Sequence, residues 1–300
     1  MIDMNSADNW RNDTHLVEYL ASQLIRGRLG LFLGAGVSAF YNLPQWDELV
    51  NDLCKLKGEP EIKPGDDVVQ KAGYIKAKYF ANDPAGFNAA VKQALYKDTT
   101  LDFARIRQSE MLAAIGSLVM SSRRGSAAMV FTLNYDDLLE NYLEFHGLTT
   151  ASVHQEKHWA EDEDVVIYHP HGLLALADRQ ESKEIVLATQ DYQDIMTSEC
   201  WEPLLETALR THTFIYIGIS GKDQHLLKLL NKVKKTHAIY QERTRFSGVR
   251  FARKSDTDEM GVILESYDVF THSVESHDET SKFLFRVCQS AREIRAKQRK

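Results

Sequence analysis

One stretch near the amino terminus, residues 29–38, constrains the fold of this chain more than any other. It reads LGLFLGAGVS, so that an apolar run ends abruptly at Gly34-Ala35-Gly36 and Ser38 follows. This pattern is typical of a buried strand that passes into a tight turn facing a phosphate. Backbone N–H groups at such a turn bind a pyrophosphate, and a Cβ at Gly34 or Gly36 would hold it away. Because similar turns in many α/β proteins bind nothing, the motif gains weight only from partners elsewhere in the chain.

Three later segments repeat the order of buried strand, polar or glycine turn, and helix. The expected strands and turns are 128–132 followed by Asn134 and Asp136, 165–168 followed by His169, His171 and Gly172, and 211–217 followed by Gly218 and Ser220. This alternation predicts an α/β fold with a Rossmann-like, doubly wound, mainly parallel sheet. In such sheets ligands bind beyond the carboxyl ends of the strands, where these polar residues would gather.

The segment 57–124 contains helical patterns and no strand signal, so we expect an all-helical insertion after the first βα unit. The chain, residues 1–300, is then a single domain with a basic tail at 289–300. We expect strands near Leu31, Val130, Val166, Ile215 and Ile239 in one sheet, a further short strand at 267–271, and a loop over 248–260.

Composition and charge exclude several classes of protein. The chain has 43 acidic and 36 basic residues and a net charge of −7, which argues against general affinity for nucleic acid. No apolar run approaches the ~20 residues that span a bilayer, and the first eleven residues lack the apolar core of a signal peptide, so we expect a cytoplasmic protein. Cys54, Cys200 and Cys288 are too few and too far apart for a disulfide framework or a four-cysteine zinc site.

Several of the polar residues have two interpretations that the residues alone leave open. Asn134 and Asp136 could face a ligand or cap the next helix. His169 and His171 flank a proline, so that one could face the same crevice; their spacing also suits a metal pair, but no third ligand is evident. Trp46, at the start of a helix, could close over a ligand or serve as a packing anchor.

Four motifs together carry a family resemblance. They are Gly34-Ala35-Gly36-Val37-Ser38, Thr132-Leu133-Asn134-Tyr135-Asp136, His171-Gly172 and Gly218-Ile219-Ser220. Their order and rough spacing resemble the NAD-binding domain of sirtuins. The stretch Leu43-Pro44-Gln45-Trp46, the Asn-Tyr-Asp form of the second motif and the Gly-x-Ser-x-x-Asp form of the last look more like the sirtuin-like (SIR2-like) NAD hydrolases of bacterial antiphage defence.

The resemblance implies a role for each matching residue. Gly34, Ala35, Gly36 and Ser38 would hold the pyrophosphate and adjacent ribose, Asn134 and Asp136 would lie by the nicotinamide ribose and amide, His171 would be the general base, and Gly218 and Ser220 would line the adenosine side. NAD+ would be a substrate, and no metal is expected. The zinc-binding cysteines of deacylating sirtuins and a recognisable acyl-peptide channel motif are missing, which argues against protein deacylation.

The expected activity is that of an NAD+ glycohydrolase that releases nicotinamide and ADP-ribose. The nicotinamide of NAD+ is already a cationic leaving group, so its departure needs the ribose held in place rather than a strong acid. Two alternatives stay open: a deacylase or ADP-ribosyltransferase of the same fold, and a non-catalytic NAD or nucleotide sensor. The pair Asn134 and His171 weighs against the sensor, because binding alone does not require both.

An unregulated NAD+ hydrolase would starve its own cell, so we expect control by assembly. The expected partners are NAD+, a sensor or activator protein encoded nearby, and further copies of the chain. No membrane and no direct nucleic-acid contact are expected. The biological role implied by the resemblance is that of the toxic effector in an antiphage, abortive-infection system.

Overall fold

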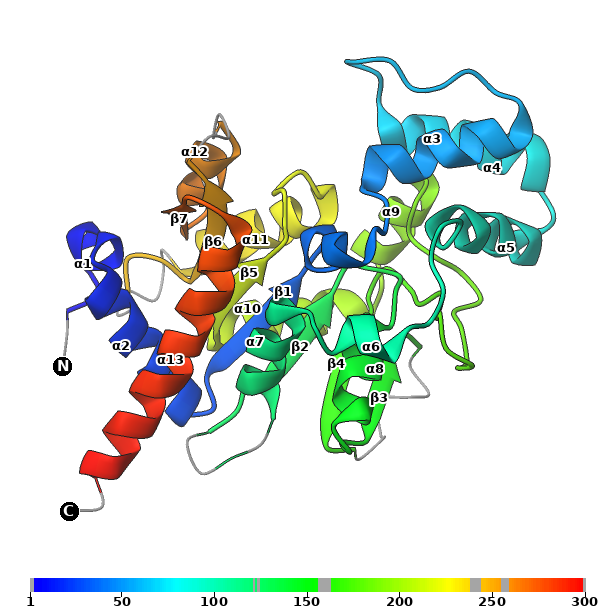
Figure 1. Cartoon of the computed structure of the whole chain (residues 1–300). Coiled ribbons are helices and arrows are strands. Elements are labelled where there is room, and N and C mark those ends of the chain that lie inside the picture. Colours follow the sequence, from blue (N-terminus) through cyan, green and yellow to red (C-terminus); the bar gives the residue numbers. More distant parts are fainter. Residues whose placement is uncertain are drawn as a thin grey trace.

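A computed structural model describes residues 3–120, 122, 125–155, 163–237, 244–254 and 259–298. These residues contain one sheet in which every pair of neighbouring strands is parallel (Figure 1). Its strands, in spatial order, are β3 (Thr150–Val153), β4 (Val165–Tyr168), β2 (Met129–Thr132), β1 (Leu29–Leu33), β5 (Thr213–Ile217), β6 (Gly248–Arg253) and β7 (Val269–Val274). The prediction of a doubly wound parallel sheet is confirmed.

The strand β1 lies in the middle of the sheet and organises it. All five of its residues are buried, as expected for a parallel strand that is covered on both faces. The chain continues from β1 to β2 on one side, and later returns to β5 on the other side. The direction of strand order therefore reverses between β1 and β5, and the turns that follow these two strands lie at the position where such folds bind ligands.

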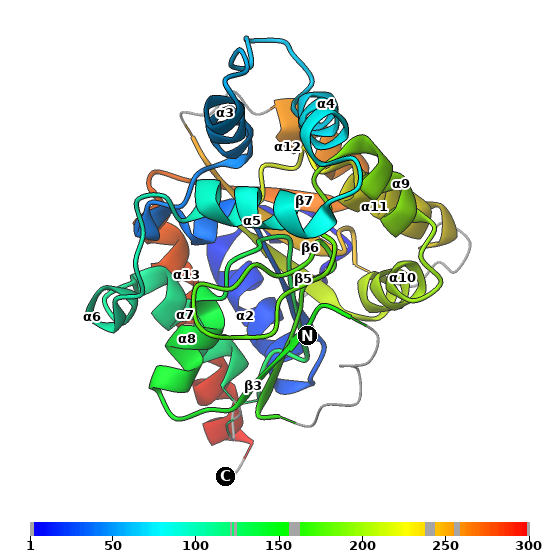
Figure 2. The ribbon, with the colours of Figure 1, turned by 90° about the vertical axis from the view of Figure 1, so that its right-hand side faces the viewer.

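Helices cover both faces of the sheet (Figures 1 and 2). Along β1, Leu31 and Leu33 pack into the core under α2, α7, α8 and α13, whereas Phe32 points to the opposite core under α10 and α11. The helices are α1 (Ala7–Arg11), α2 (Asp13–Ile25), α3 (Trp46–Lys57), α4 (Val68–Phe80), α5 (Pro84–Leu95), α6 (Phe103–Ile106), α7 (Glu110–Val119), α8 (Leu138–Phe145), α9 (Thr189–Met196), α10 (Trp201–Thr211), α11 (Gln224–His237), α12 (Glu259–Ser266) and α13 (His277–Lys297), with short 3₁₀ turns at Ala35–Val37 and Ala39–Tyr41.

The expected helical insertion is confirmed in its secondary structure, since the described residues of 57–124 contain helices and no strand. The helices α3, α4 and α5 pack on one another and lie together away from α13 (Figures 1 and 2). The last helix of the segment, α7, packs instead against α8 and α13 beside the sheet. Its apolar residues face the main core. The helix α7 therefore belongs to the layer of helices on the sheet and not to the group formed by α3, α4 and α5.

Two expectations for the second half of the chain are corrected. The segment 248–260 is not a loop, because it contains β6 and the start of α12. The charged residues of β6 concealed the strand: Arg250 is buried, and its Nε donates to the carbonyl of Ile219 at 3.1 Å. The strand expected near Ile239 lies outside the described residues. The strand β3 and the helices α9 and α10 were not expected at all.

The basic segment 289–297 is not a separate tail. It forms the last turns of α13, a helix of 21 residues that packs along α2 and α7. Ala291 is fully buried there, and an Arg295 side-chain nitrogen donates to the carbonyl of Ile25 at 3.2 Å. The basic side chains are thus part of the outer surface of a packed helix.

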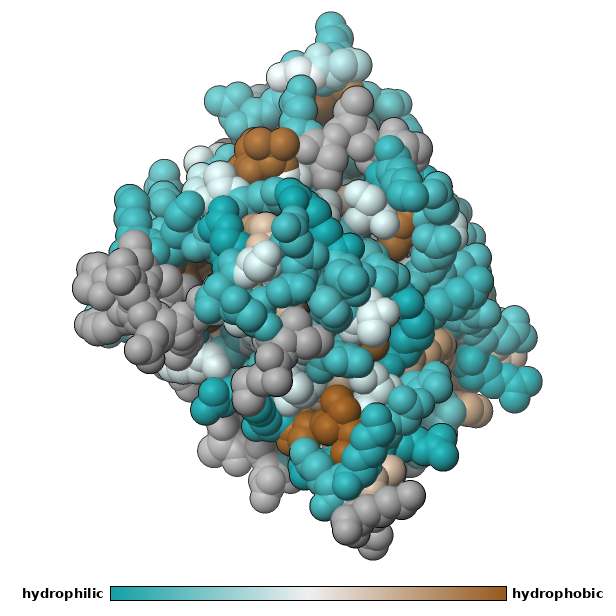
Figure 3. Space-filling view, turned by 90° about the vertical axis from the view of Figure 1, so that its left-hand side faces the viewer, coloured by the Kyte–Doolittle hydropathy of each residue, from teal (hydrophilic) through white to brown (hydrophobic). Residues whose placement is uncertain are grey.

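The face of the molecule seen in Figure 3 is mostly hydrophilic, with a few separate hydrophobic areas. Scattered apolar groups of this kind are normal on a protein surface. None of the described helices combines the length and the apolar character that a bilayer crossing requires.

Candidate functional site

The turns after β1 and β5 touch each other at the carboxyl edge of the sheet. The N–H of Gly34 donates to the carbonyl of Ile217 at 2.9 Å, and that of Gly36 donates to the carbonyl of Gly218 at 3.1 Å. A Cβ added at Gly36 would lie 2.7 Å from the Cα of Gly218, and Gly218 has a φ of +68°. The glycines therefore allow two backbones to approach closely. Ala35, half-buried, begins the 3₁₀ turn between them.

A hydrogen-bonded network joins the turn after β1 to the turn after β2. Asn134 Nδ2 donates to the carbonyl of Gly34 and to Ser38 Oγ, both at 3.1 Å. The Ser38 hydroxyl donates in turn to Asp136 Oδ2 at 2.7 Å. Among the described residues, nothing donates to Asn134 Oδ1, and the side chain is only half-buried. This carboxamide is therefore held in one orientation with its oxygen available.

Asp136 takes part in the cap of the next helix, which is one of the two interpretations of its sequence position. Its Oδ1 accepts the N–H of Leu138 at 3.2 Å at the start of α8, so it contributes to the helix cap. Burial raises the pKa of Asp136 to about 6, because the ionised carboxylate loses water, although the Ser38 hydroxyl and the Leu138 N–H oppose that effect.

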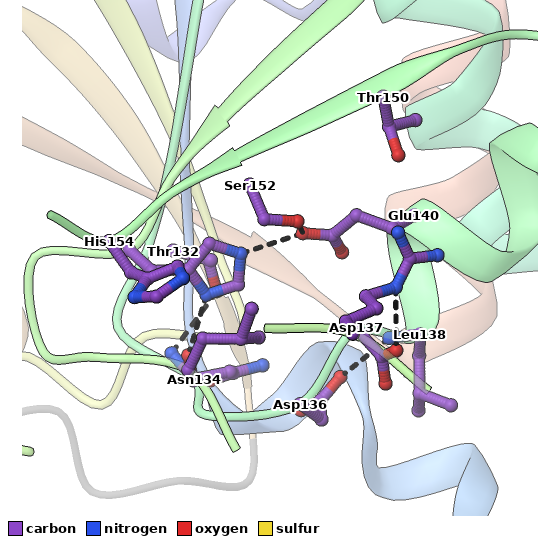
Figure 4. Close-up of polar contacts among 12 residues, drawn as sticks. Thr132, Asn134, Asp136, Asp137, Leu138, Glu140, Thr150, Ser152 and His154 are labelled. Carbon is purple, nitrogen blue, oxygen red and sulfur yellow. Dashed lines mark hydrogen bonds and ion pairs between the residues drawn. The ribbon is translucent and has the colours of Figure 1, made fainter. Parts of the chain in front are cut away.

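The two neighbouring histidines have different environments. His169 is fully buried, its Nε2 lies 2.7 Å from Glu140 Oε1, and its Nδ1 lies 3.3 Å from the carbonyl oxygen of Asn134. Figure 4 shows the surroundings of this contact, with Ser152 beside the Glu140 carboxylate. Burial alone would lower the pKa of His169, but the Glu140 carboxylate raises it above its ordinary value. Burial opposes ionisation of Glu140, but the same pairing with His169 lowers the pKa of Glu140 below its ordinary value. The Ser152 hydroxyl also donates to Glu140 Oε1 at 3.0 Å. His169 is therefore one half of a buried ion pair beneath Asn134.

His171 is also fully buried, but neither of its ring nitrogens has a hydrogen-bond partner among the described residues. Its Nε2 lies 3.8 Å from Asp223 Oδ2, and the ring of Tyr192 meets it edge-on with centroids 5.5 Å apart. Burial lowers the pKa of His171, and the Asp223 carboxylate opposes that effect. At neutral pH the imidazole is therefore uncharged and able to accept a proton.

The contact between His171 and Asp223 spans the sheet. His171 follows β4 and Asp223 follows β5, and these strands are separated by β2 and β1. Three strand spacings amount to about 14 Å, so the two loops must reach toward each other over the ends of the strands between them. The carbonyl of His171 accepts the N–H of Val186 at 2.9 Å, which holds this loop. The structure thus brings His171 to the same edge of the sheet as Asn134.

The two other expected site residues, Trp46 and Ser220, take no part in the hydrogen bonds that join Ser38, Asn134 and Asp136. Trp46 is half-buried and packs against Tyr135 and Tyr192, with ring centroids 6.4 and 6.2 Å away, as a packing anchor would. Ser220 is exposed, and its Oγ accepts the N–H of Lys222 at 3.3 Å.

Two residues that contact His171 were not expected as site residues. Asp223 ends the Gly-x-Ser-x-x-Asp stretch, and that spacing was the signal that could have identified it. Tyr192 has no such signal, because it lies in a helix that the sequence did not predict. No group of three or more histidine, cysteine or acidic residues that could hold a metal occurs within the part of the chain that the structure describes.

The fold defines the chain as a doubly wound α/β protein, and the expected site residues follow strands at the carboxyl edge of its sheet, around the switch between β1 and β5. Residues 128–270 match the family model described as a SIR2-like domain. Three of the four motifs that carry the resemblance, those that begin at Thr132, His171 and Gly218, lie within this match.

Several curated proteins are similar to this chain at low identity. NAD(+) hydrolase ThsA of Enterococcus faecium is 22% identical over 227 residues, which cover 73% of this chain and 42% of that protein. ThsA of Bacillus cereus is 22% identical over 231 residues, or 76% and 44% of the two chains. Defense-associated sirtuin 2 of Bacillus subtilis is 25% identical over 227 residues, or 75% and 21%. The chain thus spans less than half the length of these relatives.

One solved structure, titled "Structural Basis for the Mechanism and Regulation of Sir2 Enzymes", aligns with 93% of this chain and 98% of its own. The sequence identity is 12% and the TM-score is 0.45, a likeness too low to support an inference about activity.

Proposed function

We propose that this chain hydrolyses NAD+ between nicotinamide and ribose and gives nicotinamide and ADP-ribose. The observation that carries the proposal is the buried His171 imidazole, whose nitrogens have no hydrogen-bond partner among the described residues, at the sheet edge that also holds Asn134. Buried polar groups without partners are rare, and one beside a ligand crevice is well suited to act on a bound molecule. The activity named for the similar ThsA proteins points the same way.

In this proposal each residue has a separate role that follows from its position. Asn134 Oδ1, which is held outward by the contacts of Nδ2, accepts a hydroxyl of the nicotinamide ribose. The neutral His171 accepts a proton from the attacking water or from a ribose hydroxyl. The nicotinamide ring of NAD+ is already cationic and leaves as a neutral molecule, so the site needs no strong acid. Ser38, which donates to Asp136, accepts a hydrogen bond from Asn134 and so holds this side chain in its orientation.

The remaining expected contacts are part of the same proposal. The turn of Gly34, Ala35 and Gly36 lies against the pyrophosphate, and Gly218 and Ser220 line the adenosine side. Because the N–H groups of Gly34 and Gly36 already donate within the protein, these glycines act by giving the phosphates close access to the turn. Trp46 covers the nicotinamide end.

Substitution of the two central residues tests this function. Asn134→Ala and His171→Ala should each lower nicotinamide release by on the order of a hundredfold or more without unfolding the protein. His212→Ala is the matched control, since His212 lies just before β5, at the opposite edge of the sheet. Chromatography of NAD+ incubations and melting curves on the same preparations supply both readouts.

The outcome distinguishes the proposal from a structural role for these side chains. Normal turnover in a folded His171→Ala variant would rule out the mechanism. His169→Ala should differ in kind: it leaves Glu140 buried without its partner and costs about 3–5 kcal/mol of stability, while nicotinamide release per folded molecule changes less than in His171→Ala.

The alternatives predict other products. A deacylase or ADP-ribosyltransferase would release nicotinamide only when an acceptor is added, and a sensor would bind NAD+ and leave it intact. Incubation with NAD+ alone, and then with cell lysate or candidate partners, separates the three.

We further propose that residues 1–300 act as one NAD-binding unit in the cytoplasm, as the effector of an antiphage system. Its activity is low until it assembles with itself or with a sensor protein, and nucleic acid does not bind it directly. Nicotinamide release per molecule should rise with protein concentration or on addition of the partner. Full turnover by a dilute monomer, unchanged by either, would contradict control by assembly.

A further inference from the structure

We propose that Asp223 is the positioning residue for His171: its carboxylate accepts the imidazole Nε2–H, which leaves Nδ1 as the atom that takes the proton. This inference rests on the hydrolysis proposed above and deepens it, because it assigns the base to one nitrogen. A histidine tautomer is set by the hydrogen bond that its other nitrogen makes. Asp223 Oδ2, 3.8 Å from Nε2, supplies that partner.

The distance of 3.8 Å is about 1 Å longer than a hydrogen bond between charged and neutral groups. Contacts of catalytic groups are often long in the absence of substrate and shorten in the complex. The loops after β4 and β5, which carry these residues, approach each other over the ends of β2 and β1. A substrate bound between the loops and the strand ends would therefore change the distance between His171 Nε2 and Asp223 Oδ2.

Asp223 is itself held from two sides. Its Oδ2 accepts the hydroxyl of Tyr192 at 2.9 Å, and its Oδ1 accepts the N–H of Leu226 at 2.8 Å in the first turn of α11. The positive end of that helix stabilises an ionised carboxylate. A purely structural cap needs only one oxygen, and here that is Oδ1. The second oxygen points to Tyr192 and His171, which a capping role does not explain.

The other titratable groups near His171 leave Asp223 as its charged partner. The ring of His225, on α11, stacks at a centroid distance of 6.0 Å, and its Nε2 lies 3.3 Å from Glu202 of α10. Burial lowers the pKa of His225 to about 4, so it is neutral at pH 7. Tyr192, on α9, stays protonated because burial raises its pKa.

The chemical step balances with these residues. A water oxygen forms a bond to the ribose C1′ as the bond from C1′ to the nicotinamide nitrogen breaks, and nicotinamide leaves with the electron pair. One water proton passes to His171 Nδ1. The resulting imidazolium is stabilised by the Asp223 carboxylate at Nε2 until the proton goes to solvent.

Asp223→Asn tests the assignment. The side-chain oxygen of asparagine still caps α11, but an NH₂ group replaces the acceptor that faces His171. We expect kcat for nicotinamide release to fall about 10- to 100-fold with KM within about twofold. The acid limb of the kcat/KM profile should move to lower pH, because the imidazolium has lost its counter-charge. Tyr192→Phe should act in the same direction more weakly.

Asp83→Asn is the matched control. Asp83 caps α5, with Oδ1 accepting the N–H of Gly86 at 2.8 Å, and it has no place in the crevice. A kcat for Asp223→Asn equal to that of Asp83→Asn would overturn the proposal, because the effect would then be that of a helix cap.

A second readout does not depend on turnover. In ¹⁵N-histidine NMR spectra, assigned with His171→Gln, the neutral His171 ring should carry its proton on Nε2 in the unsubstituted chain and shift toward the Nδ1–H form in Asp223→Asn. An unchanged tautomer would reject the role of Asp223. If no variant and no unsubstituted protein releases nicotinamide, the proposed hydrolysis fails, yet the tautomer still decides whether Asp223 positions His171.

Discussion

Three ionisable residues at the carboxyl edge of the sheet are buried, and they differ in charge because they have different partners. His169 is paired with Glu140, Asp136 accepts from Ser38, and His171 has only the distant Asp223. Burial disfavours the charged form of each group, and only a close opposite charge reverses that effect. A fixed ion pair, a partly neutral carboxyl group and a neutral imidazole therefore lie side by side along the ends of β2 and β4.

At the residue scale, Asp136 gives a prediction for the pH dependence of stability. The folded state raises its pKa from 3.8 to about 6, so its contribution is complete at pH values below 3.8 and is lost as the pH rises through about 6. Asp136→Asn removes that loss, which is on the order of 3 kcal/mol. The free energy of unfolding of the variant, relative to that of the unsubstituted protein, should therefore increase as the pH rises from 5 to 8.

Urea unfolding at the two pH values measures this difference. Asp194→Asn, at an exposed position of α9, controls for the loss of one surface charge. If the stabilities of Asp136→Asn and the unsubstituted protein run parallel from pH 5 to pH 8, Asp136 is not the group that titrates.

At the element scale, the turns after β1 and β5 depend on the absence of side chains. Gly36 and Gly218 let the two turns touch, and the network of Ser38, Asn134 and Asp136 is attached to the first of these turns. A change in either turn should therefore be transmitted to the site.

Gly218→Ala and Gly27→Ala form a matched pair for this idea. Both glycines have positive φ, +68° and +62°, but a Cβ at Gly218 would lie 2.6 Å from the backbone nitrogen of Val37, whereas nothing lies within 4 Å of one at Gly27. Gly27→Ala should cost about 1 kcal/mol, and Gly218→Ala about 2–4 kcal/mol. Denaturant midpoints measure the costs, and equal values would mean that the turns can separate freely.

At the scale of the whole molecule, the group α3, α4 and α5 is tied to the segment that follows β4. Asn88 Nδ2, on α5, donates to the carbonyls of Ser182 and Lys183, both at 3.0 Å, and the hydroxyl of Tyr96 donates to the carbonyl of Leu174 at 2.7 Å. Because that segment also holds the loop of His171, the helical group supports the site from a distance.

Asn88→Ala should loosen this connection without unfolding the sheet. Two carbonyl groups lose their donor, at a cost of about 1–3 kcal/mol. Hydrogen exchange should accelerate over 171–188 and stay unchanged in β1 and β5. Asn51→Ala is the control, since Asn51 Oδ1 accepts the N–H of Ile62 at 2.7 Å within the helical group itself. Equal acceleration in the two variants would show that the connection is not specific.

Much of the fold was predictable because it depends on local patterns. The strand expected at 165–168 has the same bounds in the structure. The strand β6 was missed because Arg250 is buried through a bond to the Ile219 carbonyl, a partner 31 residues away that no local pattern reveals. The strand β3 was missed because its four residues, Thr150–Val153, contain no apolar run.

The sequence by itself determined the strand-turn-helix order, the glycine turns and the placement of Asn134 and His171 after strands, because periodicity and backbone freedom are properties of neighbouring residues. Only the tertiary structure decided which histidine is paired and which is unpaired. His169 and His171 have nearly the same neighbours along the chain, but Glu140 lies 29 residues from His169, and Asp223 approaches His171 from the far side of two strands. Charge, burial and distance act through space, so the chemistry of each ring was set by folding.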